Sequence, residues 1–228
     1  MSSKLSLHIG FPIFPDVTQL DFTGPFEVLT RLPGAQCHVI ATSLAPIRSN
    51  SGLSLLPTVT YADCPKLDIV CVPGGPGHLQ AMRDETLIAF LRAQATGCRY
   101  VTSVCTGSLI LAAAGLLESY RATSHWLSLD RLSGFGAIPV AERVVVDRNR
   151  ITGGGVTAGI DFALTLLALV AGETLAREVA LQIEYAPAPP FPGDPEHADP
   201  VTLRSLTQRS APYRAEMAKA DEAIRAGR

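Results

Sequence analysis

Two patterns of apolar residues alternate along the chain. Short runs that are apolar at nearly every position have the length of buried strands, and longer stretches repeat apolar residues at helical spacing. Strands are predicted at residues 5–14, 37–41, 68–72, 100–104, 121–125, 140–146 and 149–152. Helices are predicted around Phe22, Phe26 and Leu29, and at residues 85–96, 106–114, 156–170, 174–185 and 201–226. This alternation predicts an α/β fold in which helices cover both faces of a mostly parallel sheet.

Some details of these elements are also expected. Pro25 suits the first turn of its helix, and residues 46–57, rich in Ser, Gly and Pro, are expected to form a loop or a hairpin. Residues 140–152 are expected to form another hairpin. The helix at 156–170 is apolar nearly all round, which is typical of a helix buried on most sides.

The composition changes at residues 186–200, which read APAPPFPGDPEHADP. So much proline is incompatible with a helix and predicts an extended linker. Residues 201–226 are charged and rich in alanine, and are too few to form a domain with its own core. We therefore divide the chain into an α/β domain at 1–185 and a proline-rich arm with a C-terminal helix at 186–228, packed on its own subunit or on a partner.

The overall composition excludes several classes of protein. The 228 residues are 47% hydrophobic and 18% charged, which allows a sizeable core, and the net charge of −2 offers no basic surface for nucleic acid or an anionic membrane. The longest apolar run, 160–171, contains Asp161 and is too short to span a bilayer. The first apolar segment is broken by His8 and Pro12, so it is interpreted as a strand and not as a secretion signal. The cytoplasm is the expected location.

One of the five cysteines has an unusual position. An odd number of cysteines without a secretion signal argues against disulfides, and neither CxxC nor zinc-ligand spacing occurs, so no structural metal is expected. Four of them, Cys37, Cys64, Cys71 and Cys98, are expected to be small buried hydrophobes. Cys105 instead lies at the corner between a predicted strand and a small-residue helix.

The corner at Cys105 has the features of a nucleophile elbow. Ligands bind at the carboxyl ends of strands in sheets of this type, where Cys105-Thr106, Gly74-Gly75 and the loop after residue 14 are all predicted to lie. The sharp turn of an elbow needs small neighbours, which Gly107 and Ser108 supply. The helix N-terminus is expected to lower the thiol pKa. The N–H groups of Thr106 and Gly75 are candidate donors to an anion formed on a substrate.

Three residues are candidates for exchanging protons with the thiol. Asp21 lies between apolar residues at the start of a helix and is either a general acid/base or a helix cap. Glu27 is either a second acid or a solvated helix residue. His125 is either a base or a core histidine hydrogen-bonded to the backbone, and the second interpretation is favoured.

These residues carry a resemblance to a known family. The stretches PGG at 73–75, VCTGS at 104–108 and AAAGLL at 112–117 resemble the DJ-1/PfpI superfamily, over about residues 5–185. The resemblance implies a flavodoxin-like three-layer α/β sandwich with a reactive elbow cysteine. Within the superfamily, five stretches are similar to isocyanide hydratases: LDFTGP at 20–25, YVTSVCTGSL at 100–109, RATSHW at 121–126, ITGGG at 151–155 and EYAPAPPF at 184–191.

The resemblance implies a reaction and a set of site residues. Isocyanide hydratases are homodimers that convert R–N≡C to the formamide R–NH–CHO without a metal or an organic cofactor. By resemblance, Cys105 is the nucleophile, Asp21 the general acid/base and Thr106 a supporting residue. Gly74, Gly75 and Gly154 are expected to bind the substrate or its anion. The arm at 186–228 is expected at the dimer interface.

Two other functions remain open. A peptidase-like branch of the superfamily carries histidine after the elbow cysteine, so Thr106 argues against amide hydrolysis, but the elbow leaves a glyoxalase-type activity on 2-oxoaldehydes possible. The elbow and the RATSHW stretch also resemble the sensor domains of some transcription regulators, which would imply non-enzymatic ligand or redox sensing. Residues 201–228 are too few for the helix-turn-helix domain of such regulators.

Overall fold

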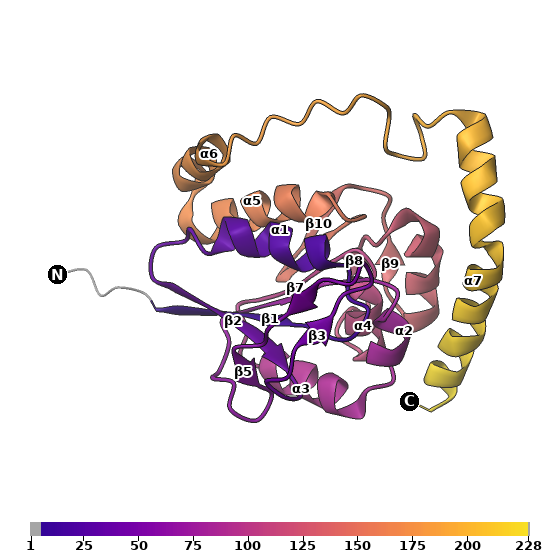
Figure 1. Cartoon of the computed structure of the whole chain (residues 1–228). Coiled ribbons are helices and arrows are strands. Elements are labelled where there is room, and N and C mark those ends of the chain that lie inside the picture. Colours follow the sequence, from indigo (N-terminus) through magenta and orange to yellow (C-terminus); the bar gives the residue numbers. More distant parts are fainter. Residues whose placement is uncertain (1–5, 228) are drawn as a thin grey trace.

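A seven-stranded sheet forms the centre of the molecule in the computed structural model, which describes residues 6–227 (Figure 1). Residues 1–5 and 228 lie outside the described residues, including Leu5 of the predicted first strand and Arg228 of the predicted arm. The strand order is β10 (Val144–Asp147), β11 (Arg150–Gly153), β7 (Tyr100–Val104), β6 (Ile69–Val72), β1 (Leu7–Pro12), β2 (Ala35–Ala41) and β5 (Val59–Thr60). Only the pairing of β10 with β11 is antiparallel, so the prediction of a mostly parallel sheet is confirmed.

Helices cover both faces of this sheet. One face carries α1 (Gln19–Leu29), α5 (Ala158–Ala171) and α6 (Glu173–Gln182), and the other carries α2 (His78–Ala81), α3 (Glu85–Ala95) and α4 (Gly107–Ala113) (Figure 1). The inner strands are apolar at nearly every position because they are covered on both sides. Ile9 of β1, Ile69 of β6 and Val101 of β7 are each fully buried. The three-layer α/β sandwich is therefore confirmed.

Several elements differ from their predicted form. Pro25 lies inside α1 and not in its first turn. The strand expected at 121–125 is only β8 (Arg121–Ala122), which pairs with β9 (Ile138–Pro139), and an unpredicted 3-10 helix, η1 (Trp126–Phe135), follows it. Residues 46–57 form the expected hairpin from β3 (Ile47–Arg48) and β4 (Ser54–Leu55). Helix α5 is buried on one side only, and Leu169 on its other side is 42% exposed.

The C-terminal part of the chain lies along the side of the sandwich. Residues 183–199 contain no helix or strand, as their proline content predicts, and they lead into the long helix α7 (Pro200–Ala226) (Figure 1). Helix α7 packs on η1 of the same chain. Three of its residues are buried, namely Met217, Ala220 and Asp221. Within residues 6–227, no helix combines the length and apolar character needed to cross a bilayer.

Candidate active site

Four neighbouring strands end at the same edge of the sheet and bring the predicted site residues together. The strands are β11, β7, β6 and β1, which are adjacent and parallel. Gly154 follows β11, Cys105 follows β7, and Gly74 and Gly75 follow β6. The loop after β1 leads into α1, which carries Asp21 in its first turn. The carboxyl-end placement predicted from the strand pattern is therefore confirmed.

Cys105 stands on a strained backbone turn. Its φ is +58°, a left-handed conformation that residues with side chains rarely adopt and that costs on the order of 1 kcal/mol. The turn is held by bonds to neighbouring segments: the Cys105 N–H donates to the carbonyls of Gly153 (3.0 Å) and Gly154 (2.9 Å). The hydroxyls of Ser108 and Ser124 donate to the Cys105 carbonyl, at 3.0 and 3.1 Å. These four hydrogen bonds hold the strained backbone of Cys105 in its left-handed conformation.

Gly107 shows why the elbow needs a small residue. A Cβ atom at this position would lie 2.1 Å from the carbonyl oxygen of Val72, which is a backbone atom of β6 and cannot move aside. Helix α4 can therefore begin this close to the end of β6 only with glycine at residue 107. The prediction of small residues after the cysteine is confirmed.

Asp21 is a fully buried carboxyl group beside the thiol. Its Oδ2 accepts a hydrogen bond from the Gly74 N–H at 3.1 Å. Its Oδ1 is buried and has no hydrogen-bond partner among the described residues. The cap position of α1 is occupied by Thr18, so Asp21 is not a helix cap. Burial raises the pKa of Asp21 to about 7, although a looser contact with the Cys105 thiol and the Gly74 N–H both favour the charged form.

The Cys105 thiol has a raised pKa, which contradicts the expected lowering by the helix N-terminus. Burial is the main cause, and the neighbouring Asp21 carboxylate adds to it. The backbone N–H groups of Thr106 and Val156 favour the charged form of the sulfur and act in the opposite direction, but they do not offset burial. Because the two acidic groups are in contact, they titrate as a pair. The Asp21 carboxylate is therefore placed to accept the thiol proton when a substrate arrives.

The remaining predicted site residues surround this pair. The Thr106 hydroxyl accepts from the Gly75 N–H at 2.9 Å and lies 3.3 Å from the Gly75 carbonyl oxygen. The N–H of Gly154 donates to the Arg143 carbonyl, so it is engaged within the protein, as are the N–H groups of Gly74 and Gly75. Val156, which the sequence did not single out, supplies a donor to the sulfur from the turn before α5.

The two other candidates for proton exchange have structural roles. Glu27 is an exposed residue of α1 that forms an ion pair with Arg31 at 2.7 Å. His125 caps η1, because its Nδ1 accepts a hydrogen bond from the Leu127 N–H at 3.3 Å. Burial lowers the pKa of His125, so its ring is neutral near pH 7. The interpretation of His125 as a histidine bonded to the backbone is confirmed.

The other four cysteines differ in burial. All five cysteines are free, and Cys71 and Cys98 are buried as predicted, with burial as the main cause that raises their pKa to about 12. Cys37 and Cys64, which were also expected to be buried, are only half-buried. Within residues 6–227, one cluster has the geometry to hold a metal ion, formed by Asp194, Glu196 and His197. It lies exposed in the linker, where His197 and Asp194 form an ion pair at 2.7 Å.

The elbow cysteine and its fold are those of a known family. A sequence model of the DJ-1/PfpI family matches residues 8–169. The chain belongs to this family. Its flavodoxin-like sandwich is accordingly the family's fold, and α6, the linker and α7 lie beyond the matched residues.

Individual relatives include enzymes and regulators. The chain is 54% identical to an isonitrile hydratase of Pseudomonas putida, over 91% of this chain and 92% of that protein. A crystal structure of a ThiJ/PfpI family protein from Pseudomonas syringae has 41% identity and a TM-score of 0.90, covering 98% of this chain and 93% of that one. The HTH-type transcriptional regulator GbdR of Pseudomonas aeruginosa is 30% identical over 78% of this chain, which spans half of the regulator's length.

Proposed function

We propose that this protein is an isonitrile hydratase, which adds water to an isonitrile (isocyanide), R–N≡C, and releases the formamide R–NH–CHO. The observation that carries the proposal is the pairing of Cys105 with Asp21, a buried carboxyl group whose pKa is raised to about 7 and whose Oδ1 is free to exchange a proton. A group with a pKa near the working pH is suited to act as both acid and base. The 54% identity to a Pseudomonas putida isonitrile hydratase supports this reaction.

The first half of the proposed reaction adds the thiol to the terminal carbon. Asp21 accepts the proton of Cys105, the sulfur forms a bond to the isocyanide carbon, and Asp21 returns the proton to that carbon. The product is the thioimidate R–N=CH–S–Cys105. Because the thiol pKa is raised, the sulfur begins protonated, and the adjacent Asp21 carboxylate is the base that releases the nucleophilic thiolate.

The second half adds water and releases the enzyme. Asp21 takes a proton from a water molecule as its oxygen bonds to the thioimidate carbon, and it delivers the proton to nitrogen. The C–S bond of the tetrahedral species R–NH–CH(OH)–S then breaks, its electrons go to sulfur, and the hydroxyl proton returns to the thiol through Asp21. The N–H groups of Thr106 and Val156 stabilise the negative charge on the departing sulfur. The steps neither oxidise nor reduce the substrate, so they require no redox cofactor.

A formamide assay on the purified protein tests this proposal. Wild type should convert a simple alkyl isocyanide to its formamide, followed by NMR. Cys105→Ala should lose the activity, and Asp21→Asn should lose about 10²–10⁴-fold of kcat. Glu27→Gln is the matched control, because it removes a carboxylate of the same helix that lies in solvent, and it should behave as wild type. Full activity in Cys105→Ala would overturn the proposal.

The same assay distinguishes the other candidate functions. A glyoxalase would convert a 2-oxoaldehyde to its hydroxy acid, and we expect no such product. A ligand or redox sensor would leave isocyanides unchanged, and its Cys105 would be oxidised by mild peroxide. The likeness to GbdR covers half of that regulator's length.

We further propose that two copies of the chain form a homodimer that works in the cytoplasm. Large apolar side chains lie exposed on α6 and on the linker: Leu181 is 82% exposed and Phe191 79% exposed. One side of α5, which packs against α6, exposes Leu169 as well. A second copy covering such apolar side chains would remove them from water. The five unpaired cysteines are in keeping with a reducing compartment.

A further inference from the structure

The helix α7 lies outside the residues matched by the family model, yet a chain of buried polar contacts connects it to the elbow. We infer that α7 is a positioning element of the active site. Its Asp221 acts through Arg131 of η1 and then through His78 of α2. The group held in place is the peptide of Gly75, which lies against Thr106.

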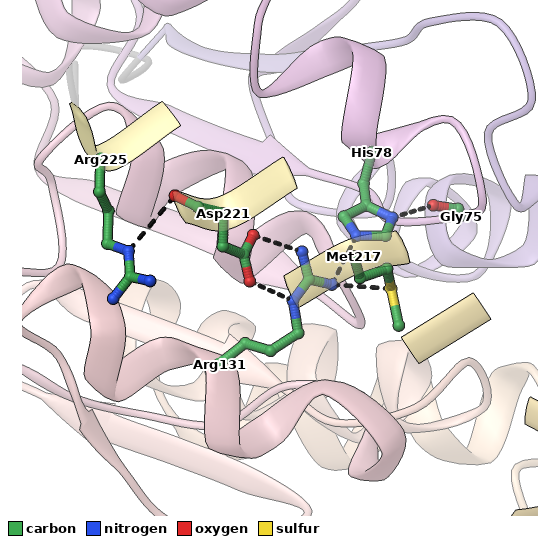
Figure 2. A network of polar contacts seen from close by, with 6 residues as sticks. All are labelled: Gly75, His78, Arg131, Met217, Asp221 and Arg225. Atoms are coloured by element: carbon green, nitrogen blue, oxygen red, sulfur yellow. Dashed lines mark hydrogen bonds and ion pairs between the residues drawn. The ribbon is translucent and has the colours of Figure 1, made fainter. Parts of the chain in front are cut away.

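The first link joins α7 to η1. Asp221 is one of three buried residues of α7, and its two carboxylate oxygens accept from Nε and Nη2 of Arg131, each at 2.7 Å (Figure 2). Both side chains are 8% exposed. A bidentate pair of this kind fixes the plane of the guanidinium group. Its remaining nitrogen, Nη1, lies 2.9 Å from the Met217 sulfur and points toward His78 (Figure 2).

The second link determines the tautomer of His78. Nη1 of Arg131 lies 2.9 Å from Nε2 of His78, and because a guanidinium group can only donate, Nε2 must accept. The ring proton is therefore on Nδ1, which donates to the Gly75 carbonyl at 2.8 Å (Figure 2). Burial and the nearby charge of Arg131 lower the pKa of His78 to about 4, so the ring is neutral near pH 7. The Gly75 carbonyl, which can only accept, requires the same tautomer, so both contacts of the ring place the proton on Nδ1.

The third link is the peptide of Gly75. Its φ is +134°, and a Cβ atom there would lie 2.3 Å from the Thr18 nitrogen, so the conformation is open to glycine alone. A residue with this much freedom is held by its hydrogen bonds. The carbonyl accepts from the backbone and the ring of His78, at 3.0 and 2.8 Å, and the N–H donates to the Thr106 hydroxyl at 2.9 Å. His78 therefore fixes the position of the Thr106 hydroxyl next to Cys105.

Two substitutions of His78 separate its two contacts. In His78→Gln the amide oxygen reaches about the position of Nε2, which keeps the acceptor for Arg131 and loses the donor to Gly75. In His78→Asn the amide nitrogen reaches about the position of Nδ1, which keeps the donor to Gly75. We expect kcat for isocyanide hydration to fall about 10- to 100-fold in His78→Gln with KM nearly unchanged. His78→Asn keeps the donor to Gly75 but cuts the link to Arg131, so its kcat should fall about tenfold with KM retained. A wild-type kcat in either variant would overturn the inference.

A matched pair of substitutions tests the helix itself. Asp221→Asn keeps the shape of the side chain and weakens its hold on Arg131, and kcat should fall about tenfold with KM retained. Arg214→Ala is the control, because it removes the exposed ion pair of 3.2 Å with Asp130, which joins the same helix to η1 without reaching His78. Its kcat should be that of wild type. Equal kcat values in the two variants would overturn the inference.

The tautomer of His78 can be measured without any variant. The kinetic readouts rest on the proposed hydratase function, whereas ¹⁵N NMR of histidine-labelled wild type does not. We expect a neutral ring protonated on Nδ1 at pH 7. A ring protonated on Nε2 would overturn the inference even if the hydratase activity is present. Failure of wild type to form formamide would instead contradict the proposed function and leave the tautomer as the test.

Discussion

At the scale of single residues, the raised pKa values of Cys105 and Asp21 are the central feature of the site. The sequence indicated both residues, because each follows a predicted strand at the carboxyl edge of the sheet. It gave the wrong direction for the thiol pKa. The helix dipole stabilises a thiolate by at most about 2 kcal/mol. Burial of the thiolate away from water, next to the Asp21 carboxylate, destabilises it by more than that. The strand pattern predicted that these residues lie at one edge of the sheet, but not how completely the packed segments would bury them.

Asp21 should reduce the stability of the fold at neutral pH. Its folded pKa of about 7 exceeds its ordinary value of 3.8, so wild type loses stability as pH rises from about 4 to 7, where the buried carboxyl group ionises. In Asp21→Asn this loss is absent. Urea unfolding should show the variant gaining up to about 4 kcal/mol over wild type between pH 4 and pH 8. A difference between Asp21→Asn and wild type that stays constant from pH 4 to pH 8 would contradict the raised pKa.

The elbow should tolerate no side chain at residue 107. Gly107→Ala places a Cβ atom 2.1 Å from the Val72 carbonyl oxygen, so the backbone of β6 or α4 must shift. We expect a loss of about 3 kcal/mol or more in unfolding free energy. Gly97→Ala is the control, since its Cβ would meet only the Gln94 carbonyl at 4.0 Å, and it should change stability by less than about 0.5 kcal/mol. Similar urea midpoints for the two variants would contradict the close approach.

At the scale of elements, strands were easier to predict than the segments that connect them. Strand β7 has its predicted bounds, and four of its five residues are buried because helices cover both faces of the sheet. Helix η1 was missed because its residues have no helical period and are held by contacts with β9, α4 and α7. The partners of Arg131 are 53 and 90 residues away in sequence, so the pattern around each one gave no signal.

The bond between α7 and η1 should contribute strongly to stability. Asp221→Ala leaves the buried Arg131 without its partner, and such a loss costs about 3–5 kcal/mol. Arg214→Ala removes an exposed pair of the same two elements and should cost less than about 1 kcal/mol. Urea unfolding of both variants checks the difference. Equal costs would mean that the buried pair does not anchor α7.

At the scale of the whole molecule, the sandwich was predictable from the alternation of strands and helices. The homodimer, with the arm at its interface, was expected from the family resemblance and stays a prediction. The sequence pattern did not single out the side chains that such an interface would bury, and the structure shows Leu181 of α6 and Phe191 of the linker exposed on the surface.

The apolar residues on that surface should hold the proposed dimer together. The double substitution Leu181→Ser and Phe191→Ser should shift the protein toward the monomer in sedimentation velocity, because it removes apolar area that the interface would bury. The elbow and α7 are left intact, so the chain should still fold. Leu206→Ser, at a residue 38% exposed on α7, is the control and should sediment as wild type. An unchanged sedimentation profile for the double variant would place the interface elsewhere or show that there is none.

The most direct test of the whole scheme is the covalent state of Cys105 during turnover. Wild type mixed with an alkyl isocyanide and quenched within one turnover should gain the mass of one isocyanide molecule on the peptide that contains Cys105, and formamide should follow. Cys105→Ala should show neither the added mass nor the product. Formamide formation with no added mass on Cys105, accompanied by activity in Cys105→Ala, would contradict the proposed nucleophile.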